Sequence, residues 1–205
     1  MSTNIGKHID NPIAFAKLAL NCDFTALKDE VLTLNELTWY SHVNASGFSG
    51  HWNVLPLYAN QAHANAHPIL QCFSIEEQNA QFGPLPIMDR LPTLKSFLAQ
   101  FKCPLKSVRL MRLEADSHIL PHRDHRLSME YGEARIHVPI VGAEQVEFVV
   151  NNRIVPMKCS EVWYLNADLE HSVSNLGAEA RINLVIDCKV GVWLKNLIES
   201  SEQKF

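Results

Sequence analysis

The part of the sequence from residue 105 to residue 189 is broken into short segments that each have the composition of a β-strand. Turn residues separate these segments at intervals of about eight to twelve residues, and Asn151-Asn152 is a hairpin turn between two of them. Seven or eight short strands spaced in this way are typical of a sandwich or jelly roll. The expected strands cover residues 106–114, 117–121, 134–141, 145–150, 153–157, 161–165, 170–175 and 180–189. We therefore expect a mainly β fold whose two sheets can hold a small-ligand site in the mouth between them.

The sequence before these strands has helical signals. Asn11-Pro12 starts a helix, since proline is favoured at the first helical position, and the apolar residues of 13–20 follow it. Asp23 can cap a second helix with apolar residues at helical spacing. Residues 46–50 are expected to form a loop, and 56–92, with five prolines, an irregular part with short strands. Pro92-Thr93 opens a short third helix.

A chain of 205 residues is most simply one domain. We predict a single domain over residues 1–205. Residues 1–50 form a helical segment that packs on one sheet, and residues 51–195 form the β core.

Composition excludes several classes of partner. A formal charge of −4 without any run of like charges argues against binding to nucleic acid or to an acidic membrane surface. No apolar stretch reaches the roughly 18 residues of a membrane span, and the first ten residues lack the apolar core of a signal peptide. The five cysteines are scattered and contain no C-x-x-C pair. We expect reduced thiols in a cytoplasmic protein; the sequence does not indicate an oligomeric state.

His122 and Asp124 are the strongest candidates for a metal site. Two residues apart on an extended strand, they point to the same face, and His171 supplies a later imidazole. Two histidines and one carboxylate on one side of a metal form the facial triad of non-haem Fe(II) oxygenases. Iron of this kind needs a carboxylate-bearing cosubstrate to activate O2, and a buried arginine such as Arg181 suits its far carboxylate. The pattern therefore indicates an Fe(II)- and 2-oxoglutarate-dependent hydroxylase.

A zinc site made from His118, His122 and His125 is the alternative for this stretch. A helical zinc-protease motif needs a glutamate between two histidines, whereas here Pro121 interrupts any helix and no glutamate is present. We expect His118 and His125 at the rim of the site or in solvent.

Alternation along the strand of residues 180–189 places Arg181 inside the sandwich. The residues of its face are Arg181, Asn183, Val185 and Asp187, while Ile182, Leu184, Ile186 and Cys188 form the apolar outer face. A buried guanidinium is costly without an anion. Its partner is either the cosubstrate or an internal acid such as Asp187 or Glu161.

Three further arginines and one histidine are candidates for the pocket. Arg135 and His137 share one face of their strand, opposite an apolar face; the alternative is an exposed edge strand. Arg109 and Arg112 have opposite parity, and we favour Arg112 as the inward residue that contacts substrate. Of the adjacent pair Trp163 and Tyr164, we expect one in the core and one on the surface.

Several segments together resemble the aspartyl/asparaginyl β-hydroxylase family, with similarity to bacterial members and to free-proline hydroxylases. The resemblance covers roughly residues 105–187. It is carried by Pro121-His122-Arg123-Asp124-His125, Arg135-Ile136-His137-Val138-Pro139-Ile140, Glu161-Val162-Trp163-Tyr164-Leu165-Asn166, His171-Ser172-Val173 with Asn175, and Arg181-Ile182-Asn183-Leu184-Val185-Ile186-Asp187.

The resemblance implies a double-stranded β-helix, a cupin-like jelly roll, with Fe(II), 2-oxoglutarate and O2. By motif, His122, Asp124 and His171 would be the catalytic iron ligands, and Arg181 would bind the far carboxylate of 2-oxoglutarate. Arg135 and His137 would contact carboxylates of cosubstrate or substrate. Animal members lack the metal-binding carboxylate that Asp124 supplies here, and their serine for 2-oxoglutarate falls near Met111.

Three functions are compatible with these features. The first is a hydroxylase that releases succinate and CO2. The second is a non-catalytic, cupin-like protein that binds or senses metal and 2-oxoglutarate. The third is a metal-dependent isomerase or dioxygenase without 2-oxoglutarate, which would have no need for Arg181. Cations at 112, 135 and 137 favour a substrate with a carboxylate; a free amino acid, a peptidyl Asp or Asn and another small acid all remain open.

Overall fold

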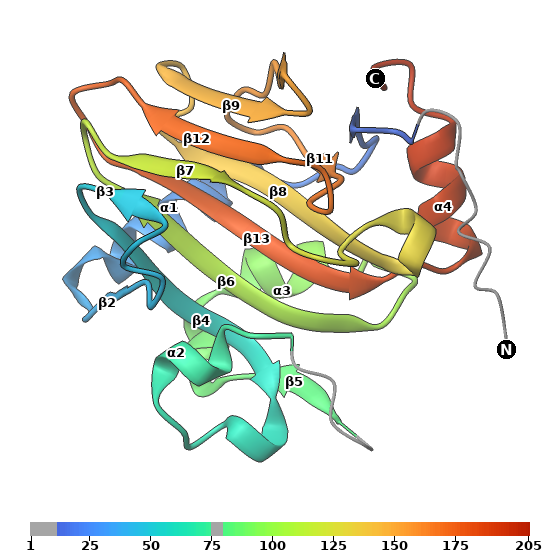
Figure 1. The fold of residues 1–205 in the computed structure, drawn as a ribbon. Coiled ribbons are helices and arrows are strands. Elements are labelled where there is room, and N and C mark those ends of the chain that lie inside the picture. Colours follow the sequence, from blue (N-terminus) through green and yellow to red (C-terminus); the bar gives the residue numbers. More distant parts are fainter. Residues whose placement is uncertain (1–11, 75–79) are drawn as a thin grey trace, which may run out of the picture.

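The computed structural model describes residues 12–74 and 80–205 of the chain. Two antiparallel sheets face each other, and the helices of residues 24–32, 92–98 and 192–199 lie on the outer side of the larger one (Figure 1). The short helix of residues 68–71 packs instead against its inner, cavity-lining face. The larger sheet has the order β1 (Phe15–Lys17), β11 (Trp163–Leu165), β8 (Glu133–Val141), β13 (Arg181–Lys189), β6 (Leu105–Leu113), β4 (Trp52–Asn60) and β2 (Tyr40–Ser41), with β5 (Phe82–Pro84) beside β4. The smaller sheet has the order β10 (Arg153–Ile154), β9 (Val146–Val150), β12 (His171–Asn175), β7 (His118–His122) and β3 (Phe48–Ser49). The mainly β prediction is confirmed.

Alternation along β8 and β13 divides the core into two layers. The outward residues of both strands pack with the helices in one cluster, which includes Ile136, Val138, Leu184 and Ile186. A second cluster lies between the sheets and combines residues such as Trp52 and Leu113 of the larger sheet with Phe148 and Val173 of the smaller. The predicted faces of both strands are confirmed, so Arg181 and Arg135 are on the inner side.

The described part of the chain has four α-helices and four 3-10 turns. They are α1 (Phe24–Leu32), α2 (Pro68–Gln71), α3 (Pro92–Leu98) and α4 (Val192–Glu199), with 3-10 turns η1 (Thr33–Glu36), η2 (Gln61–His63), η3 (Pro86–Arg90) and η4 (Met129–Tyr131). Asp23 caps α1 as predicted, accepting a hydrogen bond of 3.0 Å from the Ala26 amide. Glu30 of α1 accepts from the Thr93 amide at the start of α3, at 2.7 Å, and so fixes the two helices to each other.

The predicted helix at residues 13–20 is wrong. Phe15–Lys17 forms β1, which pairs with β11 in antiparallel register, Phe15 opposite Leu165. Phe15 packs between the sheets, while Ala16 packs toward the helices. Consecutive apolar residues occur here because both faces of the strand are covered. The first fifty residues are therefore not only helical, because they supply strands to both sheets.

Three further expectations need correction. The chain does not become irregular at Pro56: β4 runs through it, and a shift of register between Pro56 and Tyr58 accommodates the proline against β6. The loop expected at 46–50 contains β3. Trp163 and Tyr164 are both fully buried, because β11 lies between β1 and β8 and both of its faces are covered.

None of the helices in the described part of the chain combines the length and apolar character needed to span a membrane.

Candidate metal centre and cosubstrate pocket

The structure brings His122, Asp124 and His171 together. One potential ligand atom from each lies within 4.8 Å of the others. His122 ends β7 and is the register partner of His171 at the start of β12, so the sheet itself juxtaposes the two imidazoles. The sequence predicted Asp124 on the same strand as His122. In the structure β7 ends at His122, and Asp124 lies in the loop that follows. Its amide donates to the Ala167 carbonyl at 2.8 Å, which holds the loop against the segment before β12.

Both histidines are oriented by backbone carbonyls. His122 Nδ1 lies 2.8 Å from the Leu120 oxygen, and His171 Nδ1 lies 3.0 Å from the Leu169 oxygen. A ring whose Nδ1–H donates to a carbonyl keeps a lone pair on Nε2, which is the usual second-shell arrangement of a metal-binding histidine. Burial and the neighbouring His122 lower the pKa of His171 to about 4, so its ring is neutral at pH 7, as a metal ligand must be.

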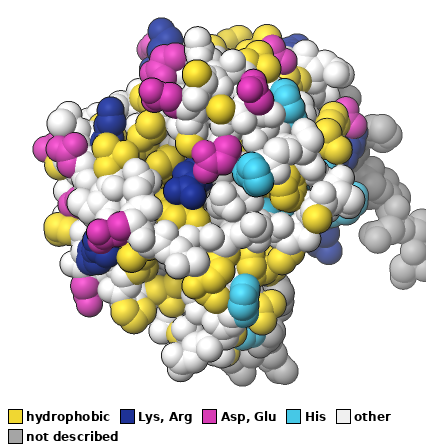
Figure 2. Space-filling model, turned by 90° about the vertical axis from the view of Figure 1, so that its left-hand side faces the viewer, with side chains coloured by type: hydrophobic (Ala, Val, Ile, Leu, Met, Phe, Trp, Pro, Cys, Tyr) yellow, Lys and Arg dark blue, Asp and Glu magenta, His cyan; other side chains and the backbone are white. Residues whose placement is uncertain are grey.

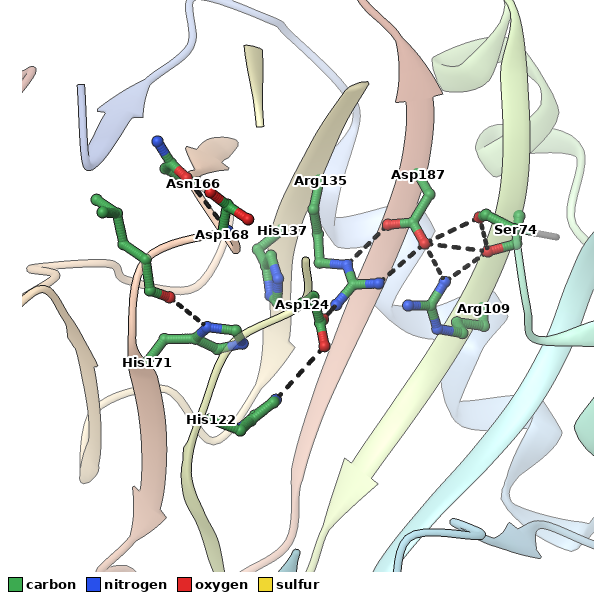
Figure 3. Close-up of polar contacts among 12 residues, drawn as sticks. Ser74, Arg109, His122, Asp124, Arg135, His137, Asn166, Asp168, His171 and Asp187 are labelled. Atoms are coloured by element: carbon green, nitrogen blue, oxygen red, sulfur yellow. Dashed lines mark hydrogen bonds and ion pairs between the residues drawn. The ribbon is translucent and has the colours of Figure 1, made fainter. Parts of the chain in front are cut away.

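Asp124 is ionised in this setting. Burial alone would raise the pKa of its carboxyl, but Arg135, His171 and His122 together outweigh burial, and the pKa falls below the usual value. Oδ2 accepts a hydrogen bond from Arg135 Nη1, and Oδ1 lies 4.0 Å from His122 Nε2 (Figure 3). Two imidazole nitrogens and one carboxylate oxygen thus converge from one side, a donor set that fits Fe(II) with open positions.

A cavity of about 690 Å³ adjoins these residues and is lined from both sheets. On the face seen in Figure 2, basic, acidic and histidine side chains meet in the middle with hydrophobic side chains around them. His125 lines the cavity, and His118 is not among the three residues that could hold a metal. The cavity is large enough for a small dicarboxylate together with a second small molecule.

Arg181 is buried in the wall of this cavity, with 4% of its surface exposed. Its guanidinium lies 5.7 Å from the centroid of the Phe148 ring, and Nη2 is 3.9 Å from Met157 Sδ, while Nε has no hydrogen-bond partner in the described part of the chain. Burial lowers the pKa of Arg181 to about 10, which leaves it charged at pH 7. A buried, unsatisfied cation facing a cavity fits an anionic ligand such as a carboxylate.

Among the described residues, neither of the two acids considered as an alternative partner pairs with Arg181. Asp187 pairs with Arg109 at 2.9 Å and with Arg135 at 2.7 Å. Glu161 pairs with Lys17 at 2.6 Å.

His137 lines the same cavity and is 6% exposed. Asn183 Nδ2 donates to its Nδ1 at 2.7 Å, and its ring packs edge-on against Phe148. Burial, helped by the charge of Arg181, holds the pKa of His137 well below its usual value. The neutral ring therefore carries its proton on Nε2, as a hydrogen-bond donor.

Arg135 faces inward as predicted, and the alternative of an edge strand is wrong because β8 lies between β11 and β13. Its guanidinium, however, is already bonded to two protein carboxylates, Asp124 and Asp187. This geometry therefore does not favour the predicted role of Arg135 as a free charge that binds a substrate carboxylate.

The choice of Arg112 over Arg109 is wrong. Arg109, Met111 and Leu113 line the cavity, whereas Arg112 points outward, pairs with Glu114 at 2.9 Å and lies 4.7 Å over the Trp39 ring. Met111 and Leu113 are indeed packing residues, but they pack between the two sheets, and Arg109 shares their parity.

Asp187 and His42 are cavity residues whose contacts were not predicted from the sequence. Asp187 is the shared counterion of Arg109 and Arg135, and its parity with Arg181 was the available signal. His42 stacks on Trp52 with ring centroids 3.7 Å apart, and burial followed by the charge of Arg109 lowers its pKa to about 4. His42 follows a two-residue strand, and no pattern in the sequence marks it.

Comparison with known proteins agrees with this geometry. The family model for aspartyl/asparaginyl β-hydroxylase matches residues 21–190. L-proline cis-4-hydroxylase of Rhizobium meliloti (strain 1021) is 24% identical over 131 residues, which are 63% of this chain and 46% of that protein. The chain thus spans about half the length of this curated relative.

Two solved structures share the fold. An oxidoreductase of the 2OG-Fe(II) oxygenase family from Burkholderia pseudomallei aligns with a TM-score of 0.52 and 16% identity, over 78% of this chain and 77% of that one. EvdMO1 aligns with a TM-score of 0.50 and 13% identity, over 88% of this chain and 48% of that one. The jelly-roll prediction is confirmed. Because the family model extends over most of its length, the chain belongs to the aspartyl/asparaginyl β-hydroxylase family.

Proposed function

We propose that this protein is an Fe(II)- and 2-oxoglutarate-dependent dioxygenase that hydroxylates a carboxylate-bearing substrate. One observation carries the proposal: Arg181, a buried guanidinium with no ion-pair partner among the described residues, opens into the same cavity as the group of His122, Asp124 and His171. A metal-dependent jelly-roll enzyme that uses no dicarboxylate would have no use for such a cation.

Each residue has a distinct task in this proposal. His122, Asp124 and His171 would hold Fe(II), and Arg181 would bind the far carboxylate of 2-oxoglutarate. His137 would donate a hydrogen bond to a carboxylate oxygen through Nε2. Fe(II) with 2-oxoglutarate and O2 supplies the oxidation, in which one oxygen enters a substrate C–H bond and the other enters succinate, with release of CO2.

The substrate is proposed to be a free amino acid or an Asp or Asn residue of a peptide. The relative named as an L-proline hydroxylase supports an amino acid. Since Arg109 and Arg135 are paired within the protein, the substrate carboxylate needs another cation. Arg126 lines the cavity with its guanidinium 5.5 Å over the Tyr131 ring, and the ion pairs among the described residues do not include it. We assign the substrate carboxylate to Arg126.

The test combines binding with turnover. Fe(II) and then 2-oxoglutarate are titrated anaerobically, and a panel of amino acids and Asp- or Asn-containing peptides is scored for substrate-stimulated succinate. A protein that bound both ligands but never released succinate above the substrate-free rate would be the non-catalytic, sensing alternative. A panel in which only uncharged compounds stimulated release would overturn the substrate class.

Arg126→Gln then tests the assigned cation. We expect a higher KM for the stimulating acid with little change in 2-oxoglutarate affinity, since Arg181 is untouched. Arg153→Gln, at an exposed position of β10, is the matched control and should behave as the wild type.

A further inference from the structure

Four charged side chains form a continuous chain through the interior, from the larger sheet to the metal site (Figure 3). Arg109 on β6 bonds Asp187 on β13, Asp187 bonds Arg135 on β8, and Arg135 bonds Asp124 in the loop after β7. The charges alternate in sign and sum to zero. They therefore satisfy one another without any ligand.

Asp187 is the fixed point of this chain. It is 2% exposed, and its two oxygens accept from Arg135 Nε at 2.7 Å, Arg135 Nη2 at 3.0 Å and Arg109 Nη1 at 2.9 Å, with a further bond of 3.0 Å from the Ser74 hydroxyl. The register of β13 against β6 shifts between Ile186 and Cys188, so Asp187 sits at an irregularity of the kind that re-aims a side chain. Burial would raise its pKa, but the two arginines hold it well below the usual range.

Asp124, unlike Asp187, is not held in place by a strand. It lies outside the strand ladder, and its carboxylate gains its orientation from Arg135, which bonds Oδ2 and leaves Oδ1 toward His122. Arg135 can do this only while its other nitrogens are held, and both are held by Asp187.

We propose that Asp187, acting through Arg135, is a positioning residue that presents one oxygen of Asp124 to the metal. This inference rests on the proposed function, because it presumes that Asp124 is a metal ligand. If Arg135 instead bound the substrate, loss of Asp187 would weaken substrate binding. The positioning role predicts that loss of Asp187 weakens metal binding. Removing a group that orients a metal ligand typically lowers affinity about tenfold to a hundredfold.

The decisive variant is Asp187→Asn, which keeps the shape but removes the charge and one acceptor. We expect Co(II), used as a spectroscopic substitute for Fe(II), to bind about tenfold to a hundredfold more weakly. Its d–d absorption should change toward that of Asp124→Ala, which lacks the carboxylate altogether.

Glu133→Gln is the matched control. Glu133 pairs with Lys106 at 3.2 Å between the same strands β8 and β6, and that pair is also largely buried, with side-chain exposures of 19% and 8%. The control removes a carboxylate from a β6–β8 ion pair without touching Asp124. Its Co(II) affinity should equal that of the wild type even if its melting temperature falls.

A double-mutant cycle separates positioning from general destabilisation. In the Asp124→Ala background, Asp187→Asn should cause no further loss of Co(II) affinity, because the ligand on which it acts is gone. Losses that add in full would overturn the proposal. So would a folded Asp187→Asn protein with wild-type affinity and spectrum.

If Asp187→Asn does not fold, Arg135→Lys decides the question. It keeps the charge balance, but an ammonium cannot bridge the two carboxylates as the guanidinium does, so Co(II) binding should weaken about as much. Unchanged binding in that variant would refute the inference. A wild-type protein that bound neither Co(II) nor Fe(II) would instead refute the proposed function.

Discussion

His122 and His171 are register partners on the adjacent strands β7 and β12, with ring centroids 4.2 Å apart. Two imidazoles held this way by a backbone ladder need no further folding to receive an ion. The pair thus defines the metal site more rigidly than Asp124, which is anchored through a loop. Loss of either ring should therefore be more damaging than loss of the carboxylate.

We expect His122→Ala and His171→Ala each to lose most Fe(II) affinity and all turnover. Asp124→Ala should retain some Fe(II) binding, because both imidazoles remain. The measurement is anaerobic titration with Fe(II), and His118→Ala, on the same strand but outside the ligand group, is the control. Full metal binding by both histidine variants would show that the site lies elsewhere.

Arg181→Met should weaken 2-oxoglutarate binding about tenfold to a hundredfold, which corresponds to the loss of a charge-assisted contact of about 1.5–3 kcal/mol. Fe(II) affinity should stay nearly unchanged, because Arg181 contacts Met157 and Phe148 and none of the three metal-site residues. Anaerobic isothermal titration of the metal-free protein with Fe(II), and then of the Fe(II)-loaded protein with 2-oxoglutarate, measures both quantities. A folded variant with wild-type 2-oxoglutarate affinity would remove Arg181 from the cosubstrate site.

The metal-free protein should lose stability as the pH falls from about 7 to about 5. Because burial lowers the pKa of His171 to about 4, the unfolded chain takes up a proton in this range that the folded chain does not. The buried His137 acts in the same direction. Each such histidine lowers the free energy of unfolding by about 1–2 kcal/mol at about pH 5.

Urea unfolding in the presence of a chelator measures this dependence. His171→Asn should show a shallower fall, because one of the titrating groups is gone. Stability that is constant or rises toward pH 5 would contradict the buried, neutral state of these rings.

Alternation along single strands was enough to predict much of the site. The inner faces of β8 and β13 follow from period two alone, and they place Arg181, Arg135 and His137 in the cavity. Strand pairing, in contrast, depends on which strands become neighbours. The sequence therefore could not show that Asp187 lies opposite Arg135. Nor could it show that the Arg135 guanidinium is bonded to Asp187 and so is not free to bind a substrate.

The errors in the fold have a common physical origin. Residues 13–16 are apolar on consecutive positions, a pattern shared by buried helices and by strands covered on both faces. Trp163 and Tyr164 were expected on a strand, and their pattern left open whether one face or both faces of that strand are covered. Only the neighbours decide between them, and here β1 and β8 flank β11. Pro56 is tolerated in β4 because the register shifts beside it, which composition alone does not reveal.

Arg109 and Arg112 should differ sharply in their contribution to stability. Arg109→Met removes one counterion of Asp187 from a buried pair with side-chain exposures of 5% and 2%, and breaking such a pair costs about 3 kcal/mol or more. Arg112→Met breaks a partly exposed pair with Glu114, a change typically worth about 1 kcal/mol or less. Urea unfolding of the metal-free variants at neutral pH gives both values. Equal losses would mean that Asp187 is satisfied by Arg135 and the serine hydroxyls alone, and that Arg109 is not needed to hold the charge chain behind Asp124.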